Sequence, residues 1–300
     1  MNGVFHRLYY ALTEYKRKGE TTLILGAGCS LSSTIKDVST IGIMKESLYE
    51  HNIAIDDEKN WEDIYSNFIN VVWSGKTERE QRELLNKRFE GMTPTNAHKC
   101  LKNLIEAGYI NNIITTNFDL LIETVCEDMS YLKRTGEMGY SKHGNAEPKF
   151  NLLKVHGDLD SGILRFSPAE LMKLSPDLSN DINKKTLGLT IFIGYRGQDV
   201  GLMNSINCNS SSSMFWIDIS GPYNQNSYEA QKIINLLSAR ESLENVLSGK
   251  KFGDFNNILP ELNSILVLKN HKSIINAQKK HLISEWQDTS ILDVLSINSR

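Results

Sequence analysis

Asn117 and Asp119 lie two residues apart between two apolar runs, and they are the side chains best placed to do chemistry in this sequence. The residues before them, 112–116, predict a buried strand, and the residues after them predict a helix over about 119–127. In a parallel α/β sheet, such a junction lies at the carboxyl end of a strand, where ligands bind. Asn and Asp are also preferred helix N-caps, so this segment alone allows either a cap or a ligand contact.

Three other predicted strands also end in small or polar residues. They are followed by residues 26–30 (Gly-Ala-Gly-Cys-Ser), 156–158 (His-Gly-Asp) and 194–199 (Gly-Tyr-Arg-Gly-Gln-Asp). Carboxyl ends of parallel strands share one edge of a sheet, so these loops are expected to converge with Asn117 and Asp119 on one crevice. Each motif is weak alone, and the four together indicate a site.

The glycine turn at residues 26–30 has two interpretations. Glycines let a backbone bend and approach a pyrophosphate, whose charge is then stabilised by amides at a helix N-terminus. The alternative is a tight turn without a ligand. A dehydrogenase fingerprint is excluded because Leu31 occupies the third glycine position, and a P-loop is excluded because no Gly-Lys-Ser/Thr follows. Cys29 is interpreted as a small filler, since no activating base can be placed beside it.

His156 follows an apolar strand and is the histidine that could act as a general base near neutral pH. A positioned base contributes about 10²–10⁴ in rate. The alternative is a structural hydrogen-bonding residue at a strand end. Asp158 and Asp160 can simply terminate the strand, and no role is assigned to His98 or His143.

The order of elements predicts an α/β fold with a Rossmann-like, doubly wound parallel sheet, because strands alternate with helices. Residues 1–300 are expected to form a single domain, with a helical insertion at 32–92 and a mostly helical C-terminal part at 222–300. Residues 134–148 are interpreted as a polar excursion. Strands are expected at residues 21–25, 112–116, 150–155, 187–193 and 213–217, with 265–268 as a candidate last strand. Helices are expected at 4–17, from 93 to about 108, and from 119, 167 and 199.

Composition excludes several classes of protein. The 300 residues are 40% hydrophobic and carry a formal charge of −3, which argues against a dominant nucleic-acid-binding surface. No apolar run reaches the roughly 18 residues that a membrane-spanning helix needs, and the N-terminus does not resemble a signal peptide, so a cytoplasmic protein is expected. The four cysteines are dispersed along the chain, so their spacing fits neither a zinc ribbon nor a disulfide framework.

Taken together, the motifs resemble the sirtuin-like family, and specifically its bacterial NAD-hydrolase branch found among anti-phage effectors. The resemblance covers about residues 20 to 220. It is carried by residues 26–30 (Gly-Ala-Gly-Cys-Ser), 94–98 (Pro-Thr-Asn-Ala-His), 115–123 (Thr-Thr-Asn-Phe-Asp-Leu-Leu-Ile-Glu), 154–158 (Lys-Val-His-Gly-Asp) and 193–199 (Ile-Gly-Tyr-Arg-Gly-Gln-Asp).

The resemblance implies a Rossmann-like NAD⁺ site with Asn117 and His156 as the catalytic pair. It also implies that Asp119 helps to hold the nicotinamide end of the dinucleotide. The remaining residues expected to bind the dinucleotide are Gly26, Ala27, Gly28 and Ser30 at the phosphates, Gly194 and Asp218 near the adenosine half, and Thr116 and Asp199.

The chain also departs from the deacylase branch of the family. Deacylases continue the glycine turn into a Ser-Gly-Ile-Pro-Asp-Phe-Arg-like segment, whereas residues 31–37 here are Leu-Ser-Ser-Thr-Ile-Lys-Asp. Deacylases also normally carry a four-cysteine zinc ribbon, which the cysteines here cannot form. No metal is therefore expected, and removal of an acyl group from lysine is disfavoured.

The expected function is hydrolysis of NAD⁺ to nicotinamide and ADP-ribose, in an NAD-depleting effector of abortive infection. The alternatives are an NAD-dependent protein deacylase and a non-catalytic NAD- or ADP-ribose-binding subunit. Because no sensor domain is recognisable, a separately encoded regulatory subunit is expected, together with homo-oligomerisation. Neither membrane insertion nor direct nucleic-acid binding is expected. The residues after 221 could contact the partner or simply cover the sheet.

Overall fold

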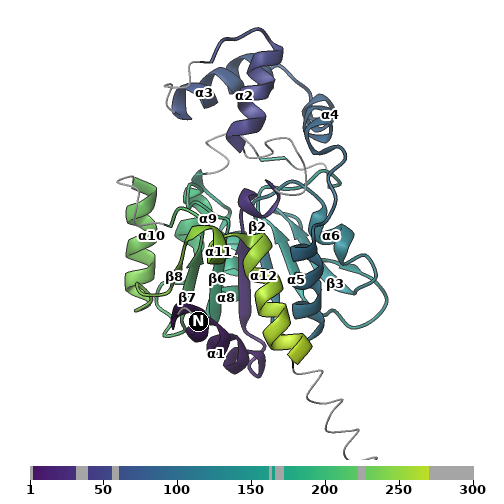
Figure 1. The fold of residues 1–300 in the computed structure, drawn as a ribbon. Helices are drawn as coiled ribbons and strands as arrows, with labels where there is room; N and C mark the ends of the chain where they lie inside the picture. Colours follow the sequence, from purple (N-terminus) through teal and green to yellow (C-terminus); the bar gives the residue numbers. More distant parts are fainter. Residues whose placement is uncertain are drawn as a thin grey trace, which may run out of the picture.

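The computed structural model describes residues 3–31, 40–55, 61–161, 164–165, 172–221 and 228–269. Its centre is an eight-stranded sheet of order β4-β3-β5-β2-β1-β6-β7-β8 (Figure 1). The strands pair in parallel, except that β4 runs antiparallel to β3. The predicted α/β fold with a parallel sheet is therefore confirmed, and the sheet differs from the prediction only in its antiparallel edge strand β4. The strands are β1 (Thr21–Leu25), β2 (Asn112–Thr115), β3 (Tyr131–Thr135), β4 (Ser141–His143), β5 (Asn151–Lys154), β6 (Leu189–Ile193), β7 (Met214–Ile217) and β8 (Val246–Leu247).

The first strand, β1, lies in the middle of the sheet. It pairs with β2 on one side and with β6 on the other, so the strand order reverses direction at β1. Leu25 is level with Thr115 and with Ile193, and Thr115 is in turn level with Lys154. The carboxyl ends of β1, β2, β5 and β6 therefore lie side by side, as the sequence predicted, and the switch point is where such sheets bind ligands.

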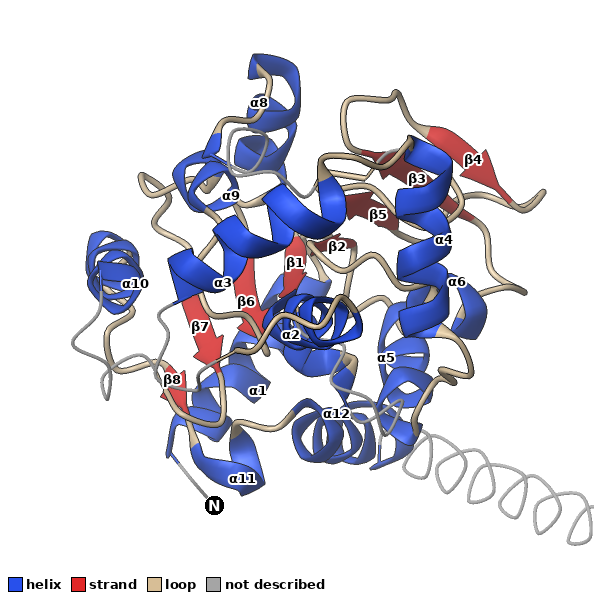
Figure 2. Cartoon of the chain, turned by 90° about the horizontal axis from the view of Figure 1, so that it is seen from above, coloured by secondary structure: helices blue, strands red, loops and turns tan. Residues whose placement is uncertain are grey.

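Helices cover both faces of the sheet (Figures 1 and 2). Side chains alternate along each strand, so that Leu23 and Leu25 contribute to the hydrophobic cluster on one face and Ile24 to the cluster on the other. The first face is covered by α1 (Gly3–Lys16), α5 (Asn96–Glu106) and α12 (Phe255–Asn263), and the second by α8 (Pro176–Lys185), α9 (Val200–Ser205) and α10 (Tyr228–Ala239). Two further short helices are α6 (Leu121–Val125) and α11 (Gly249–Phe252).

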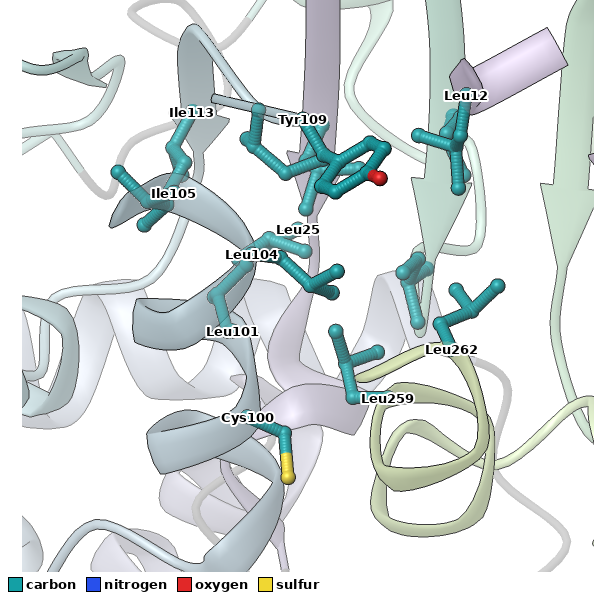
Figure 3. Packing of buried hydrophobic residues seen from close by; sticks show 14 of the residues in the cluster. Leu12, Leu25, Cys100, Leu101, Leu104, Ile105, Tyr109, Ile113, Leu259 and Leu262 are labelled. Atoms are coloured by element: carbon teal, nitrogen blue, oxygen red, sulfur yellow. The ribbon is translucent and has the colours of Figure 1, made fainter. Parts of the chain in front are cut away.

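The larger cluster is packed between α5, α12 and β1 (Figure 3). Leu101 and Leu104 of α5 face Leu259 and Leu262 of α12, and all four are at most 4% exposed. Burial of one such leucine is worth about 1.5–3 kcal/mol relative to its exposure. This apolar interface holds α5 and α12 against the sheet, and so fixes the position of the first turn of α5 beside the end of β1.

Between β1 and α5 the chain forms a helical module, defined here as the described residues of 40–89. It contains α2 (Thr40–Glu50), α3 (Trp61–Asn67), the π-helical segment η3 (Phe68–Trp73) and α4 (Glu78–Phe89). The module lies above the carboxyl ends of the strands (Figures 1 and 2). Its hydrophobic cluster includes Phe118 from the loop after β2, which ties the module to the predicted site.

Two expectations about strands were wrong. Residues 265–268 form part of the π-helical segment η5 (Ser264–Leu268), which continues α12, and the strand at the far edge of the sheet is β8. A four-residue apolar run fits a buried helix as well as a strand, and periodicity cannot separate the two. The expected polar excursion at 134–148 contains the end of β3 and all of β4. Because β4 is an exposed edge strand, its sequence Ser-Lys-His carries no hydrophobic signal.

Three of the expected helices begin near Pro94, residue 167 and Asp199. Pro94 precedes the N-cap Thr95 rather than lying in the first turn, so α5 begins at Asn96. The helix expected from residue 167 lies outside the described residues. Asp199 is the N-cap of α9, as predicted, and its Oδ1 accepts a hydrogen bond of 2.8 Å from the Leu202 amide.

Arg240, directly after α10, connects several loops at the opposite end of the sheet from these strand ends. The residue is 3% exposed, and burial lowers the pKa of its guanidinium to about 10, which leaves it charged at neutral pH. It donates to four backbone carbonyl oxygens, those of Ser212 (2.8 Å), Thr186 (2.8 Å), Gly188 (2.7 Å) and Asn207 (3.2 Å).

We expect Arg240→Met to lower the free energy of unfolding by about 3 kcal/mol or more. A buried acceptor that loses its donor costs about 1–3 kcal/mol, and several lose theirs here. Urea denaturation measures the change. Arg79→Met is the matched control, because the Arg79 side chain is 87% exposed and should change stability by no more than about 0.5 kcal/mol. Equal stabilities for the two variants would contradict the structural role of Arg240.

Candidate functional site

The glycine turn after β1 lies in direct backbone contact with the loop after β6. A Cβ atom on Gly26 would lie 2.4 Å from the carbonyl oxygen of Gly194, and a Cβ atom on Gly28 would lie 2.8 Å from the Cα atom of Gly194. Gly194 itself has a φ of +60°, and the Gly28 amide donates to its oxygen at 3.0 Å. The close approach of these two loops therefore requires all three glycines, whether or not a ligand is bound.

Most amides of this turn donate within the protein. Those of Gly26, Gly28, Cys29 and Ser30 bond to the carbonyl oxygens of Ile193, Gly194, Gly26 and Ala27 respectively. In the described part of the chain, the amide of Ala27 has no such acceptor. The turn thus offers a phosphate fewer free donors than the sequence suggested, and its role in binding phosphates stays a prediction.

Asn117, Ser30 and Asp119 form a chain of hydrogen bonds that joins the loops after β1 and β2. Asn117 Nδ2 donates to Gly26 O at 3.0 Å and to Ser30 Oγ at 2.9 Å. Ser30 Oγ in turn donates to Asp119 Oδ2 at 2.7 Å. The predicted residues on these two loops are therefore brought together.

This chain of bonds fixes the orientation of the Asn117 amide. A backbone carbonyl can only accept, so the atom that faces Gly26 O must be the nitrogen of Asn117. Both amide hydrogens then have partners, at Gly26 and Ser30. The oxygen, Oδ1, makes no hydrogen bond within the described residues, and Asn117 is only half-buried. The free polar atom of Asn117 is an acceptor.

The helix-cap interpretation fits Asp119 but not Asn117. Asp119 Oδ1 accepts from the Leu121 amide at 3.1 Å, just where α6 begins, so Asp119 satisfies a backbone donor at the start of that helix. The Asn117 side chain bonds no amide of α6. Asp119 is 5% exposed, with its second oxygen held by Ser30.

His156 follows β5, and its Nε2 contacts Oδ2 of Asp199. The two side chains are 9% and 6% exposed. Phe118, between Asn117 and Asp119, lies with its ring centroid 6.4 Å from that of His156. Asp199 was expected among the residues that bind the dinucleotide, and the structure places it against His156.

A small cavity lies beneath the loop that carries Asn117. Its volume of ≈ 10 Å³ suits about one water molecule. His98 of α5 is part of its wall, although no role was assigned to His98 from the sequence. The signal was present, because Thr95 and His98 have the spacing of a capping box, in which the Thr95 amide donates to His98 Nδ1 at 3.1 Å. The lining residues are Leu25, Cys29, Ser30, His98, Thr115, Asn117, Asp119, Ile122 and Lys154.

A buried cluster of charges supports the loops from the β3 and β5 side. Lys133 Nζ lies 2.8 Å from Glu123 Oε1 and 2.6 Å from Asp158 Oδ2, and Lys154 Nζ lies 3.3 Å from the same Glu123 oxygen. Burial opposes the charge on Lys133, but the two carboxylates outweigh burial and raise its pKa. Burial likewise opposes the charge on Asp158, whose pKa is nevertheless lowered by Lys154 and Lys133.

This cluster reaches the candidate site through Lys154, which donates to the backbone oxygen of Asp119. Asp158 was interpreted as a residue that ends a strand, but it is fully buried and paired with Lys133. Spacing along the chain does not indicate these pairs, because the two lysines and two acids come from three separate segments.

Thr116 and Asp218 are the remaining predicted residues. Thr116 is half-buried beside Asn117. Asp218 follows β7 at the same edge of the sheet, where its Oδ2 accepts from the Ser220 amide at 2.9 Å. Within the described residues, no hydrogen bond or ion pair joins Asp218 to Asn117 or His156.

The cysteines do not form a reactive or metal-binding group in the described chain. Burial raises the pKa of the Cys29 thiol well above its usual value, and its Sγ donates to Ile193 O at 3.2 Å, which agrees with a filler role. Among residues 3–31, 40–55, 61–161, 164–165, 172–221 and 228–269, no cluster of three or more His, Cys, Asp or Glu side chains could hold a metal ion. In the same ranges, no helix is long and apolar enough to cross a membrane.

Comparison with protein families identifies residues 111–237 as similar to the SIR2-like domain. This segment runs from β2 to α10 and includes Asn117, Asp119, His156 and Asp199. The glycine turn after β1 and the helical module lie before it. A search of curated proteins gave no match.

The chain is also similar to solved structures of Sir2 proteins. One, described as the structural basis for the mechanism and regulation of Sir2 enzymes, is 11% identical, with a TM-score of 0.49 over 88% of this chain and 98% of that chain. Another, a mutant of a Sir2 homologue in complex with ADP ribose, is 14% identical, with a TM-score of 0.46 over 88% and 95%.

His98 should make stability depend on pH. Burial lowers its pKa from 6.5 to about 4, against the opposite effect of the Asp119 charge. Neutral His98 therefore contributes its full stability above about pH 6.5, and this is lost as the pH falls toward 4, because the unfolded chain takes up the proton first. Between pH 7 and pH 5 we expect a loss of about 2 kcal/mol from this residue.

Urea denaturation at the two pH values measures this loss. In His98→Asn, whose oxygen can still accept from the Thr95 amide, the pH dependence should shrink by that amount. His6→Asn is the control, because His6 is exposed and should leave the pH dependence unchanged. An unaltered pH dependence in His98→Asn would show that His98 is not held neutral by burial.

Proposed function

We propose that this protein is an NAD⁺ glycohydrolase that cleaves NAD⁺ to nicotinamide and ADP-ribose. The observation that carries the proposal is the orientation of Asn117, whose free acceptor oxygen lies at the same sheet edge as His156 and beside the glycine turn. The similarity of residues 111–237 to the SIR2-like domain supports an NAD⁺ substrate.

The chemistry of the bond suits these residues. When the bond between C1′ and nicotinamide breaks, its electron pair neutralises the pyridinium, and positive charge develops on the ribose. An acceptor oxygen such as Asn117 Oδ1 stabilises that charge and orients the attacking water, because a preorganised dipole is effective where water is largely excluded. His156 accepts the proton that the water releases when its oxygen bonds to C1′.

Other residues would hold the dinucleotide. Asp119, buried beside Ser30, would orient the carboxamide of nicotinamide in the geometry that favours cleavage. Gly26, Ala27 and Gly28, with Ser30, would lie along the phosphates. Gly194 and Asp218 would lie nearer the adenosine, and Thr116 would line the ribose end.

The second candidate function is an NAD-dependent protein deacylase, which the SIR2-like match accommodates equally. The two reactions share the cleavage of the nicotinamide bond and differ in the oxygen that attacks C1′. We favour water because residues 31–37 depart from the deacylase sequence and the cysteines cannot form its zinc ribbon. The third alternative, a non-catalytic NAD- or ADP-ribose-binding subunit, would keep the glycine turn but would release no nicotinamide.

We further propose that NAD⁺ depletion serves anti-phage defence by abortive infection in the cytoplasm. A separately encoded protein would switch the enzyme on, and the chain would act as a homo-oligomer. Incubation with NAD⁺, with and without the proteins encoded by neighbouring genes, tests this by nicotinamide release. Activity that appears only with a neighbour protein is the expected result, and constitutive activity of the chain alone would contradict control by a partner.

His156→Ala and Asn117→Ala should each lower kcat for nicotinamide release by about 10²–10⁴-fold, because each removes one of the two groups that act at C1′. Rates are measured on the activated protein, and thermal melting checks that the fold is intact. The controls are His6→Ala and Asn209→Ala, which change exposed residues of the same types and should keep wild-type rates. Near-wild-type turnover in either site variant would contradict the assignment.

A further inference from the structure

His156 and Asp199 form a buried pair that the proposed reaction does not by itself require. Asp199 lies on the loop after β6, 43 positions from His156 in a chain numbered 1–300, and the two meet because β5 and β6 end at the same sheet edge. Within the described residues, His156 is the only ion-pair partner of Asp199. A buried carboxylate is costly unless it is paired, so this contact accounts for the position of Asp199.

Both oxygens of Asp199 have defined directions. Oδ1 accepts from the Leu202 amide at 2.8 Å as the N-cap of α9, and this bond holds the carboxylate in place. Oδ2 is left to face His156. The neighbouring Tyr195 stays a neutral phenol, because burial and the Asp199 charge hold its pKa well above the usual value. Tyr195 therefore carries no charge beside Asp199.

The contact decides which nitrogen of His156 carries a proton. A carboxylate oxygen only accepts, so Nε2 must be the donor, and turning the ring over would place a carbon against the carboxylate instead. In the neutral imidazole, the lone pair is then on Nδ1. Nδ1 makes no hydrogen bond to the described residues, so it is available to a substrate or water.

On the basis of the proposed hydrolysis, we infer that Asp199 is a positioning residue that fixes His156 in the tautomer whose Nδ1 takes the proton from the attacking water. The water oxygen bonds to C1′ as the bond from C1′ to nicotinamide breaks, and the electron pair of that bond leaves with nicotinamide. The proton of the water moves to Nδ1, and the imidazolium that results is stabilised by the Asp199 carboxylate at Nε2. Asp199 neither gains the proton nor touches the dinucleotide in this role, which differs from the dinucleotide contact expected from the sequence.

Asp199→Asn tests the inference with little disturbance of the fold. The Leu202 amide is a donor, so the oxygen of the new side chain must face it, and Asn is as good an N-cap as Asp. The NH₂ group must then face His156 Nε2. Two donors cannot bond to each other, so Nε2 gives up its proton, Nδ1 gains one, and the base loses its lone pair.

We expect Asp199→Asn to lower kcat for nicotinamide release by about 10²–10⁴-fold, as far as loss of the base itself would, while KM for NAD⁺ changes by no more than about threefold. A residue that only bound the dinucleotide would raise KM instead. Asp254→Asn is the matched control, since Asp254 is also an N-cap aspartate, with its oxygen 2.9 Å from the Asn256 amide. It should retain wild-type kcat and KM.

Nitrogen NMR of the imidazole, assigned by comparison with His156→Gln, gives a readout that does not depend on turnover. Nε2 should carry hydrogen in the wild type and be unprotonated in Asp199→Asn. Unprotonated Nε2 in the wild type, or an Asp199→Asn variant with unchanged kcat in an active preparation, would overturn the inference. If the wild type releases no nicotinamide under any condition, the proposed hydrolysis fails, and the NMR result still decides whether Asp199 sets the tautomer.

Discussion

The backbone contact between the glycine turn after β1 and Gly194 after β6 is the constraint on which the candidate site depends. Three glycines allow it, because a Cβ on Gly26 or Gly28 would lie within 3 Å of Gly194. The contact fixes Gly26 O, which orients the amide of Asn117. Gly194 is also the first residue of the loop that brings Asp199 to His156. One close approach of two loops thereby positions both halves of the proposed catalytic pair.

Buried polar groups then hold the Asn117 half of the pair in place. Ser30 joins Asn117 to Asp119, and Lys154 joins Asp119 to the charge cluster of Lys133, Glu123 and Asp158. Because the charges of Lys133, Glu123 and Asp158 are paired, displacing one loop would leave a buried charge without its partner, which costs several kcal/mol. A rigid arrangement of this kind is what stabilisation of a developing positive charge requires, since the dipoles must not reorganise during the reaction.

Much of the fold could be predicted from the sequence, because the central strands are continuous apolar runs followed by glycine or polar residues. The edge strands and β3 could not: β4 is exposed and polar, β8 has two residues, and β3 contains the charged residues Lys133 and Arg134. Within the site, the sequence indicated which residues converge but not what each one contacts. The pairing of Asp199 with His156 and the place of His98 in the cavity wall depend on which helix packs against which strand end, and one-dimensional spacing does not contain that information.

The central claim is that water, rather than an acylated lysine, attacks the ribose. Its most direct test is the release of nicotinamide and ADP-ribose from NAD⁺ by the activated protein in the absence of any acylated peptide, with both products quantified by chromatography. Hydrolysis predicts the two products in equal amounts, at a rate that added acetylated peptide does not change. Nicotinamide release that requires the peptide, with an acylated ADP-ribose as the product, would contradict the account.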